Sequence, residues 1–279
     1  GIRIQTDMVA RRVLVADAYE GAPALAAGID RGAAITAIGP NASALRPVAD
    51  ILAAEGAAGV SDALGPPTAG TIRALEIEDG NGRRVVTVTK AVFSISPVSN
   101  RFGAQVLDDS GRRVGYLNLR TFIDTADPAL RQAFATFRAQ GITDFIIDFR
   151  YNGGGLVDIA DLMGDLLGDN RAAGDVFSVT EYRPSKGQFN ETRRFQRQPQ
   201  SVPPARIAFI TTSASASASE LVVNGMQPWL RDRLILVGSN TFGKPVGQIA
   251  RDRSACDDRL RVVAFETKNA DRQGGYYNG

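Results

Sequence analysis

Short apolar runs alternate with amphipathic stretches along the last two thirds of the chain. Apolar runs predict buried strands, and apolar positions spaced three and four apart predict the helices between them. The expected strands cover residues 114–119, 144–149, 206–210 and 234–237. The expected helices cover residues 127–140, 156–167 and 219–230. Strands that alternate with helices predict an α/β fold with a largely parallel sheet.

The first part of the chain has a different pattern, with short strands around one helix. Strands are expected at residues 13–15, 34–38, 72–77 and 84–88, and the Asp-Gly-Asn-Gly stretch at 79–82 predicts a hairpin between the last two. Pro23 suits the first turn of a short helix over residues 24–27. Residues 48–70 look like a long and loose connection. We therefore expect two domains, a small β-rich one over residues 1–93 and an α/β one over residues 94–279.

Composition narrows the classes of function. The 32 basic and 30 acidic residues nearly balance, which gives no reason to expect nucleic acid or a membrane surface as a partner. No apolar run approaches the ~20 residues that span a bilayer. Cys256 is the only cysteine, so we expect no intrachain disulfide, no zinc cluster, no metal and no cofactor. The chain starts at Gly1 and is interpreted as a trimmed fragment.

The absence of histidine decides which nucleophilic mechanisms are open. Every Ser-His or Cys-His mechanism is excluded. Only four of the 32 basic residues are lysines, and lysine, unlike arginine, can act as a neutral base when it is buried. Lys244 follows an apolar strand and lies between Gly243 and Pro245, away from a charged face. Gln248 could hold its amine by hydrogen bonding. The alternative is an ordinary loop lysine.

A run of alternating serine and alanine separates the strand near residue 210 from the helix that begins near Glu220. A serine at a strand-to-helix junction lies near the positive end of the helix dipole, and small neighbours let a substrate approach. The alternative for Ser217 or Ser219 is a helix N-cap, and a flexible linker fits poorly between two apolar elements. Three glycines at 153–155 also separate a strand from a helix, where free N–H groups favour an oxyanion. A plain tight turn is the alternative for that triple.

These motifs together resemble the C-terminal processing peptidases, or tail-specific proteases, a family of Ser-Lys serine endopeptidases that usually carry a PDZ domain. The matching pieces are residues 114–119 with Phe122, then 147–155, 215–221 and 238–248, in family order. The resemblance implies a ClpP/crotonase-like catalytic core of βα units, preceded by a small β-rich PDZ-like domain.

The resemblance also implies roles for single residues. Ser217, three residues before Glu220, corresponds to the nucleophile, Lys244 to the base and Gln248 to the residue that orients the base. The backbone N–H groups of Ala218 and Gly154 correspond to the oxyanion hole. The spacing from Ser217 to Lys244 looks about two residues longer than is common in the family, and the extra length falls in 228–233, where insertions are tolerated. Ser215 is the alternative if the register of the serine run is misplaced.

The beginning of the chain resembles a bacterial protease-associated PDZ domain over residues 23–39, although Ala33 stands where aspartate is usual. Such domains bind C-terminal peptides by adding a strand and capturing the carboxylate on backbone N–H groups. The substrate-binding residues are then Gly1, Ile2, Arg3 and Ile4, as the remaining end of the carboxylate-binding loop. The implied partners are proteins or peptides with free C-termini, and the implied location is extracytoplasmic, in a bacterial periplasm or envelope.

Three functions are compatible with these sequence motifs. The first is a serine endopeptidase that cleaves protein or peptide substrates near their C-termini. The second is a non-catalytic peptide- or ligand-binding protein on the same scaffold. The third is an acyl-CoA hydratase-like enzyme, which also uses glycine-rich oxyanion loops but gives no reason for the PDZ-like beginning. A complete set of Ser217, Lys244 and Gln248 favours the endopeptidase.

Overall fold

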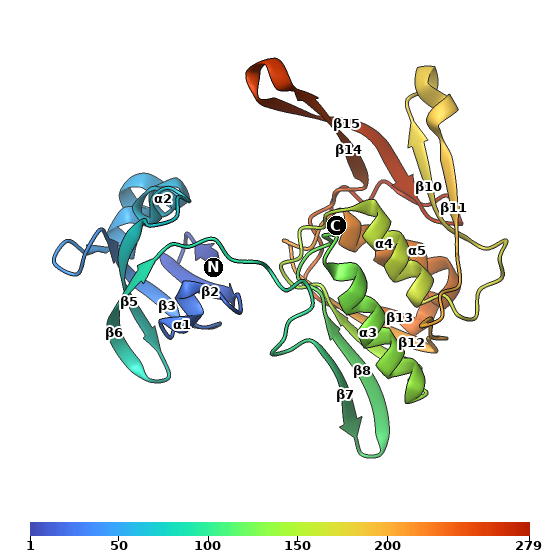
Figure 1. Ribbon diagram of the computed structural model, residues 1–279, viewed down its shortest axis with the longest axis horizontal. Coiled ribbons are helices and arrows are strands. Elements are labelled where there is room, and N and C mark those ends of the chain that lie inside the picture. Colours follow the sequence, from blue (N-terminus) through green and yellow to red (C-terminus); the bar gives the residue numbers. More distant parts are fainter. The chain divides into compact units, whose positions relative to one another are not determined.

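The computed structural model describes all 279 residues and divides them into two compact units, Gly1–Ser96 and Pro97–Gly279 (Figure 1). The sequence places the change of pattern at residue 94. Each unit has its own buried apolar cluster, so each is described by itself.

The first unit is an antiparallel sheet with two helices. Its strands follow the order β1-β2-β3-β5-β6, with β4 paired to β3. The elements are β1 (Ile2–Asp7), β2 (Arg12–Ala18), α1 (Pro23–Ala26), β3 (Ala34–Gly39), β4 (Arg46–Pro47), α2 (Val48–Leu64), β5 (Ile72–Asp79) and β6 (Gly82–Thr89). The expected strands and short helix are all present. Pro23 begins α1, where its missing N–H leaves no hydrogen bond unmade.

Helix α2 corrects the prediction that residues 48–70 form a loose connection. Its buried side chains include Ile51, Leu52 and Val60, which pack into the apolar cluster of the first unit. The helix is interrupted at Gly56, whose φ of +68° is not helical. That break and the many small residues hide the helical period of the apolar positions, which explains why the sequence pattern was misread.

The second unit confirms the α/β class. Its five-stranded sheet has the order β13-β12-β9-β8-β7, in which only the β7–β8 pair is antiparallel. The strands are β7 (Ala104–Asp109), β8 (Arg112–Asn118), β9 (Asp144–Asp148), β12 (Arg206–Thr211) and β13 (Leu234–Gly238), and the helices are α3 (Ala126–Ala139), α4 (Val157–Leu166) and α5 (Ala218–Leu230). The core contains contacting aromatic rings of Phe122, Phe149 and Phe209. Burial of such large apolar side chains is the main stabilising contribution to a domain of this kind.

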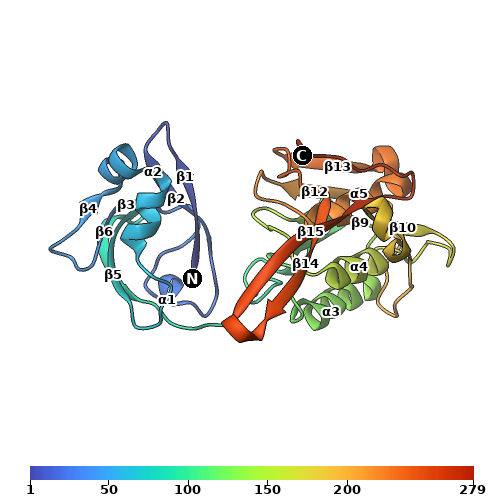
Figure 2. The same cartoon turned by 90° about the horizontal axis from the view of Figure 1, so that it is seen from above.

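A second sheet of four strands belongs to the same unit and has the order β11-β10-β15-β14. Its elements are β10 (Val176–Tyr182), the 3-10 helix η1 (Pro184–Phe189), β11 (Glu191–Arg194), β14 (Val246–Arg253) and β15 (Asp258–Lys268), with short 3-10 turns η2 (Arg231–Arg233) and η3 (Ser254–Cys256) elsewhere in the unit. Figure 2 shows β14 and β15 as one long two-stranded ribbon. The apolar pattern did not predict this long ribbon, because most of β14 and β15 is exposed and lacks a buried face.

None of the helices combines the length and the apolar character needed to cross a bilayer.

Candidate active site

Two turns meet at one edge of the five-stranded sheet. Strands β9 and β12 are parallel neighbours, with Asp148 opposite Ile210 at their carboxyl ends. The carboxyl ends of parallel strands lie at the same edge of a sheet, where ligands of such folds usually bind. The glycine turn that follows β9 and the serine turn that follows β12 therefore lie side by side.

Asn152 connects the two turns by hydrogen bonds. It is fully buried, and its backbone oxygen accepts hydrogen bonds from the Ala216 N–H and the Ser219 hydroxyl, both at 3.0 Å. Its side-chain Nδ2 donates to the Leu119 oxygen at 2.8 Å, and its Oδ1 accepts the Gly154 N–H at 3.0 Å. One residue thus fixes the end of β8, the glycine turn and the serine turn relative to one another.

Gly154 allows the closest approach between the turns. Its φ is +93°, and a Cβ at this position would lie 2.8 Å from the Ser217 Cβ and 2.8 Å from the Ala218 nitrogen. Only glycine fits, both sterically and by conformation. The Gly154 N–H, a predicted oxyanion donor, makes an internal hydrogen bond to Asn152, so a substrate oxygen would have to share or replace that bond.

Ser217 has an unusual backbone conformation. Its φ of 56° and ψ of −112° lie in a region that L-residues rarely adopt. It occupies the N-cap position of α5, and its N–H donates to Glu220 Oε2 at 2.6 Å. Outliers of this kind persist only where surrounding contacts hold them, and they cluster at functional sites.

The two buried serines of the run, Ser215 and Ser219, form hydrogen bonds with the backbone. Ser215 is fully buried, donates its hydroxyl to the Phe149 oxygen at 2.6 Å and accepts the Thr212 N–H at 2.9 Å. Ser219 donates to Asn152 and does not cap the helix, because the N-cap position belongs to Ser217. Ser217 and the exposed Ser213 are therefore the serines of the run that solvent can reach.

Glu220 connects the serine turn to the lysine loop. Only 3% of this residue is exposed. Its Oε2 accepts the N–H of Ser217 at 2.6 Å and that of Lys244 at 3.0 Å, and its Oε1 accepts the N–H of Gly243 at 2.7 Å. A buried carboxylate is stable only with such partners. The sequence interpretation used Glu220 merely to mark the helix start, although its spacing from Ser217 is that of a capping box.

Two further contacts fix the loop that carries Lys244. The Phe242 N–H donates to the Ser215 oxygen at 2.8 Å, and a Cβ on Gly243 would lie 2.4 Å from the Tyr277 oxygen. The backbone of Lys244 is thereby held beside the serine turn. Gln248 lies four residues further on, exposed on β14 and opposite Val263.

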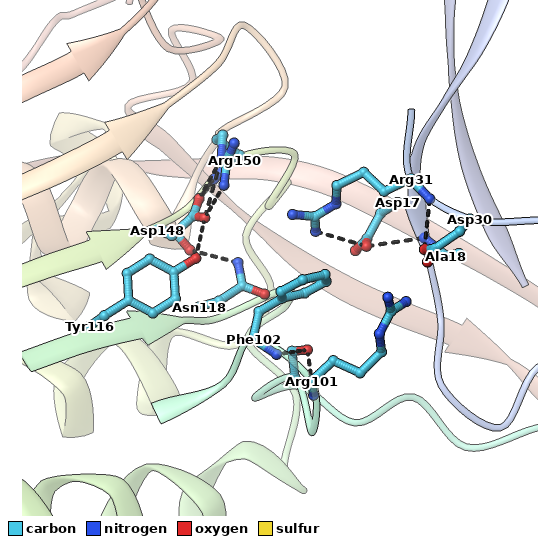
Figure 3. Close-up of polar contacts among 11 residues, drawn as sticks. Asp17, Ala18, Asp30, Arg31, Arg101, Phe102, Tyr116, Asn118, Asp148 and Arg150 are labelled. Atoms are coloured by element: carbon cyan, nitrogen blue, oxygen red, sulfur yellow. Dashed lines mark hydrogen bonds and ion pairs between the residues drawn. The ribbon is translucent and has the colours of Figure 1, made fainter. Parts of the chain in front are cut away.

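An ion pair between the buried Asp148 and the partly exposed Arg150 supports the start of the glycine turn. Asp148 has no exposed surface and accepts hydrogen bonds from the Tyr116 hydroxyl and from Arg150, both at 2.7 Å (Figure 3). Burial, and then the bond to Asp148, raise the pKa of Tyr116 to about 12. Asn118 donates to the Asp148 backbone oxygen at 3.3 Å. Loss of Arg150 would leave the buried Asp148 carboxylate without its ion-pair partner, which is costly, so these contacts stabilise the turn.

The predicted substrate-binding residues of the first unit lie in a strand. Ile2, Arg3 and Ile4 pair with β2, and β1 is the edge strand of its sheet. The Gly1 oxygen accepts the Tyr19 N–H at 2.9 Å. These residues thus form an edge to which an extended peptide could add, and only Gly1 precedes the strand.

No group of three or more acidic, cysteine or histidine side chains is placed to hold a metal ion. At the edge of the sheet, a solvent-accessible serine lies beside backbone N–H groups and next to the loop that carries Lys244.

Comparison with known proteins identifies the family more closely. The model of peptidase family S41 matches residues 113–273, and the chain belongs to this family. This confirms the resemblance that the sequence motifs indicated. The chain is 29% identical over 188 residues to a carboxyl-terminal-processing protease of Synechocystis sp. PCC 6803, covering 65% of this chain and 39% of that protein. It is 28% identical over 182 residues to the chloroplastic carboxyl-terminal-processing peptidase 2 of Arabidopsis thaliana, covering 61% and 32%. The chain thus spans well under half the length of these relatives.

Solved structures share the fold. A Bacteroides fragilis NCTC 9343 protein named as an S41 protease matches with a TM-score of 0.73 and 22% identity, over 98% of this chain and 71% of that one. The photosystem II D1 C-terminal processing protease matches with a TM-score of 0.55 and 23% identity, over 98% and 68%.

Proposed function

We propose that this chain is a serine endopeptidase with Ser217 as nucleophile and Lys244 as base. The observation that carries the proposal is the carboxylate of Glu220, which accepts the backbone N–H of Ser217 and of Lys244. Membership of family S41 and the absence of histidine support the same assignment.

The proposed chemistry is acyl transfer. The uncharged Lys244 amine takes the Ser217 hydroxyl proton while Oγ bonds to the scissile carbonyl carbon. The carbon–nitrogen bond then breaks, and the departing amine takes the proton from Lys244. Water, activated by the same lysine, releases the acyl group. Gln248 is assigned the orientation of the amine.

The N–H groups of Ala218 and Gly154 are assigned to the developing oxyanion. Ala218 opens α5, where the N–H groups of the first turn have no partner within the helix. Gly154 would exchange or share its bond to Asn152 as the oxyanion forms.

We further propose that the first unit is a PDZ-like domain that binds the free C-terminus of protein or peptide substrates along β1, near Gly1, Ile2, Arg3 and Ile4. Support comes from the edge position of β1 and from the C-terminal processing proteases among the relatives. Replacing the substrate's terminal carboxylate by an amide is expected to raise KM. An unchanged KM would contradict this part of the proposal.

We also propose an extracytoplasmic location. Its support is that three of the relatives are chloroplastic processing peptidases. Fractionation of cells that express the native gene tests it, and recovery of the protein only with cytoplasmic markers would contradict it.

Labelling with a serine-reactive fluorophosphonate probe tests the nucleophile. Ser217→Ala is expected to abolish labelling and to lower peptide hydrolysis by about 10³-fold or more. Ser213→Ala is the matched control, because Ser213 is exposed in the same turn, and it should label and cleave as the parent does. Full labelling of Ser217→Ala would overturn the assignment.

A further inference from the structure

A pocket of about 440 Å³ lies in the second unit, where strands β10 and β15 separate. The two strands pair from Val179 with Lys268 to Tyr182 with Phe265. Beyond that pair, β10 leads into η1, whereas β15 continues beside β14, and the two arms diverge (Figure 1). The pocket fills this fork, and its walls include Arg183, Lys186, Phe189, Arg251, Val262 and Val263.

The pocket walls combine exposed apolar side chains with basic side chains that form no ion pair. Phe189 is 55% exposed and Val263 is 57% exposed. Arg183, Lys186 and Arg251 line the same pocket without an acidic residue among the lining residues.

The nearest carboxylates on the paired strands are already engaged. Glu181 lies 2.6 Å from Lys268 and 2.7 Å from Arg272, and Glu266 lies 2.8 Å from Lys268. None of the three pocket cations takes part in an ion pair with them. The pocket is therefore complementary to a ligand that is both anionic and partly apolar.

The pocket lies a few residues along the chain from Lys244, the proposed base. Strand β14 begins two residues after Lys244, and its Ile249, five residues from the lysine, lines the pocket. At ~3.3 Å per residue of a strand, Lys244 and Ile249 are at most about 16 Å apart, because two of the five steps precede β14 and the strand has a register shift between Gly247 and Gln248. An extended peptide of about five residues covers that distance.

We propose that this pocket is a secondary substrate site that binds a carboxylate next to an apolar side chain, about four to six residues from the cleaved bond. This inference rests on the proposed peptidase function. We assign the carboxylate to an Asp or Glu side chain of the substrate, because the terminal α-carboxylate is proposed to bind the first unit.

Binding of labelled peptides to the full chain with Ser217→Ala tests the proposal without cleavage. Three apolar peptides of one length are compared by fluorescence anisotropy. The first is amidated and contains one Glu, the second is amidated with Gln in its place, and the third has that Gln and a free C-terminus. The amidated pair avoids the terminal carboxylate that the first unit is proposed to bind.

Arg251→Gln is expected to weaken binding of the Glu peptide about threefold to tenfold, as for the loss of a charge-assisted hydrogen bond. Lys186→Gln should also weaken binding of the Glu peptide. Neither substitution should change the affinity for the amidated Gln peptide. Arg253→Gln is the matched control, because Arg253 is exposed on the same strand and does not line the pocket. Weaker binding of the free-acid peptide by these two variants would show that the pocket also binds the α-carboxylate.

Equal affinity of parent and pocket variants for the Glu peptide would overturn the inference. Binding of phosphatidylglycerol vesicles that is lost in Arg251→Gln, with peptide binding unchanged, would overturn it in favour of a membrane surface. Failure of the proposed peptidase function is separately visible. It appears as a parent chain that does not hydrolyse peptides, or as hydrolysis that survives Ser217→Ala.

Discussion

At the residue scale, Glu220 has no proposed chemical step, but it fixes the positions of the residues that do. Glu220 satisfies three backbone N–H groups from two segments that lie more than twenty residues apart. Its effect on the proposed reaction is therefore through geometry. A displacement of either segment would change the approach of the Ser217 oxygen to the Lys244 amine, and small misplacements in a catalytic site can cost large factors in rate.

Glu220→Gln tests that positioning role. The amide keeps the size of the side chain but replaces one acceptor oxygen by a donor, which leaves at least one buried N–H unpaired at a cost of about 1–3 kcal/mol. We expect a lower free energy of unfolding and a kcat reduced about 10- to 100-fold, with KM little changed. Thermal unfolding and steady-state kinetics measure both.

Asp252→Asn is the control for this substitution. Asp252 pairs with Arg259 on the exposed ribbon, and exposed pairs contribute little. No measurable change is expected there. A Glu220→Gln protein with parental kcat would contradict the positioning role.

At the scale of elements, helix α4 carries an acidic side chain whose ionisation opposes folding. Burial raises the pKa of Asp161 to about 6, against the pull of Arg193, which lies 3.2 Å away. In the unfolded chain the pKa of an aspartate is about 3.9. The folded state therefore binds the proton more tightly, and this contribution to stability is full below about pH 4 and is lost as pH rises through about 6.

Asp161→Asn removes that dependence. Relative to the parent, the variant should gain stability between pH 4 and pH 8, by at most about 3 kcal/mol at ~1.4 kcal/mol for each unit of pKa difference. Urea unfolding at several pH values measures the gain. Asp109→Asn, at an exposed position of β7, is the control without such a gain. A difference between Asp161→Asn and parent that is constant with pH would contradict the account.

Elements also differ in how well the sequence predicted them. The strands and helices around the five-stranded sheet were predicted because buried apolar runs mark them directly. Helix α2 was missed because Gly56 interrupts it and small residues hide its period. The β14–β15 ribbon was mostly missed because charged residues dominate its outer end and most of its positions are exposed.

At the scale of the whole molecule, the order of motifs along the chain gave the family, and the family match over residues 113–273 confirms it. The two compact units follow the change in pattern near residue 94. The interior bonds of the site could not be predicted, because Asn152 and Glu220 join segments that only folding brings together. The sequence chose Ser217 over Ser215 only by the resemblance, through its offset from Glu220. The burial of Ser215 and the hydrogen bond from its hydroxyl to the Phe149 oxygen support that choice.

The proposed mechanism depends on Lys244 acting as the base for Ser217. Its most direct test is the rate of peptide hydrolysis by Lys244→Arg, because arginine keeps the positive charge but cannot lose its proton in a protein. We predict a fall in kcat of about 10²- to 10⁴-fold, as for loss of general-base catalysis, with an unfolding midpoint close to that of the parent. Retention of full activity by the folded variant would contradict the mechanism.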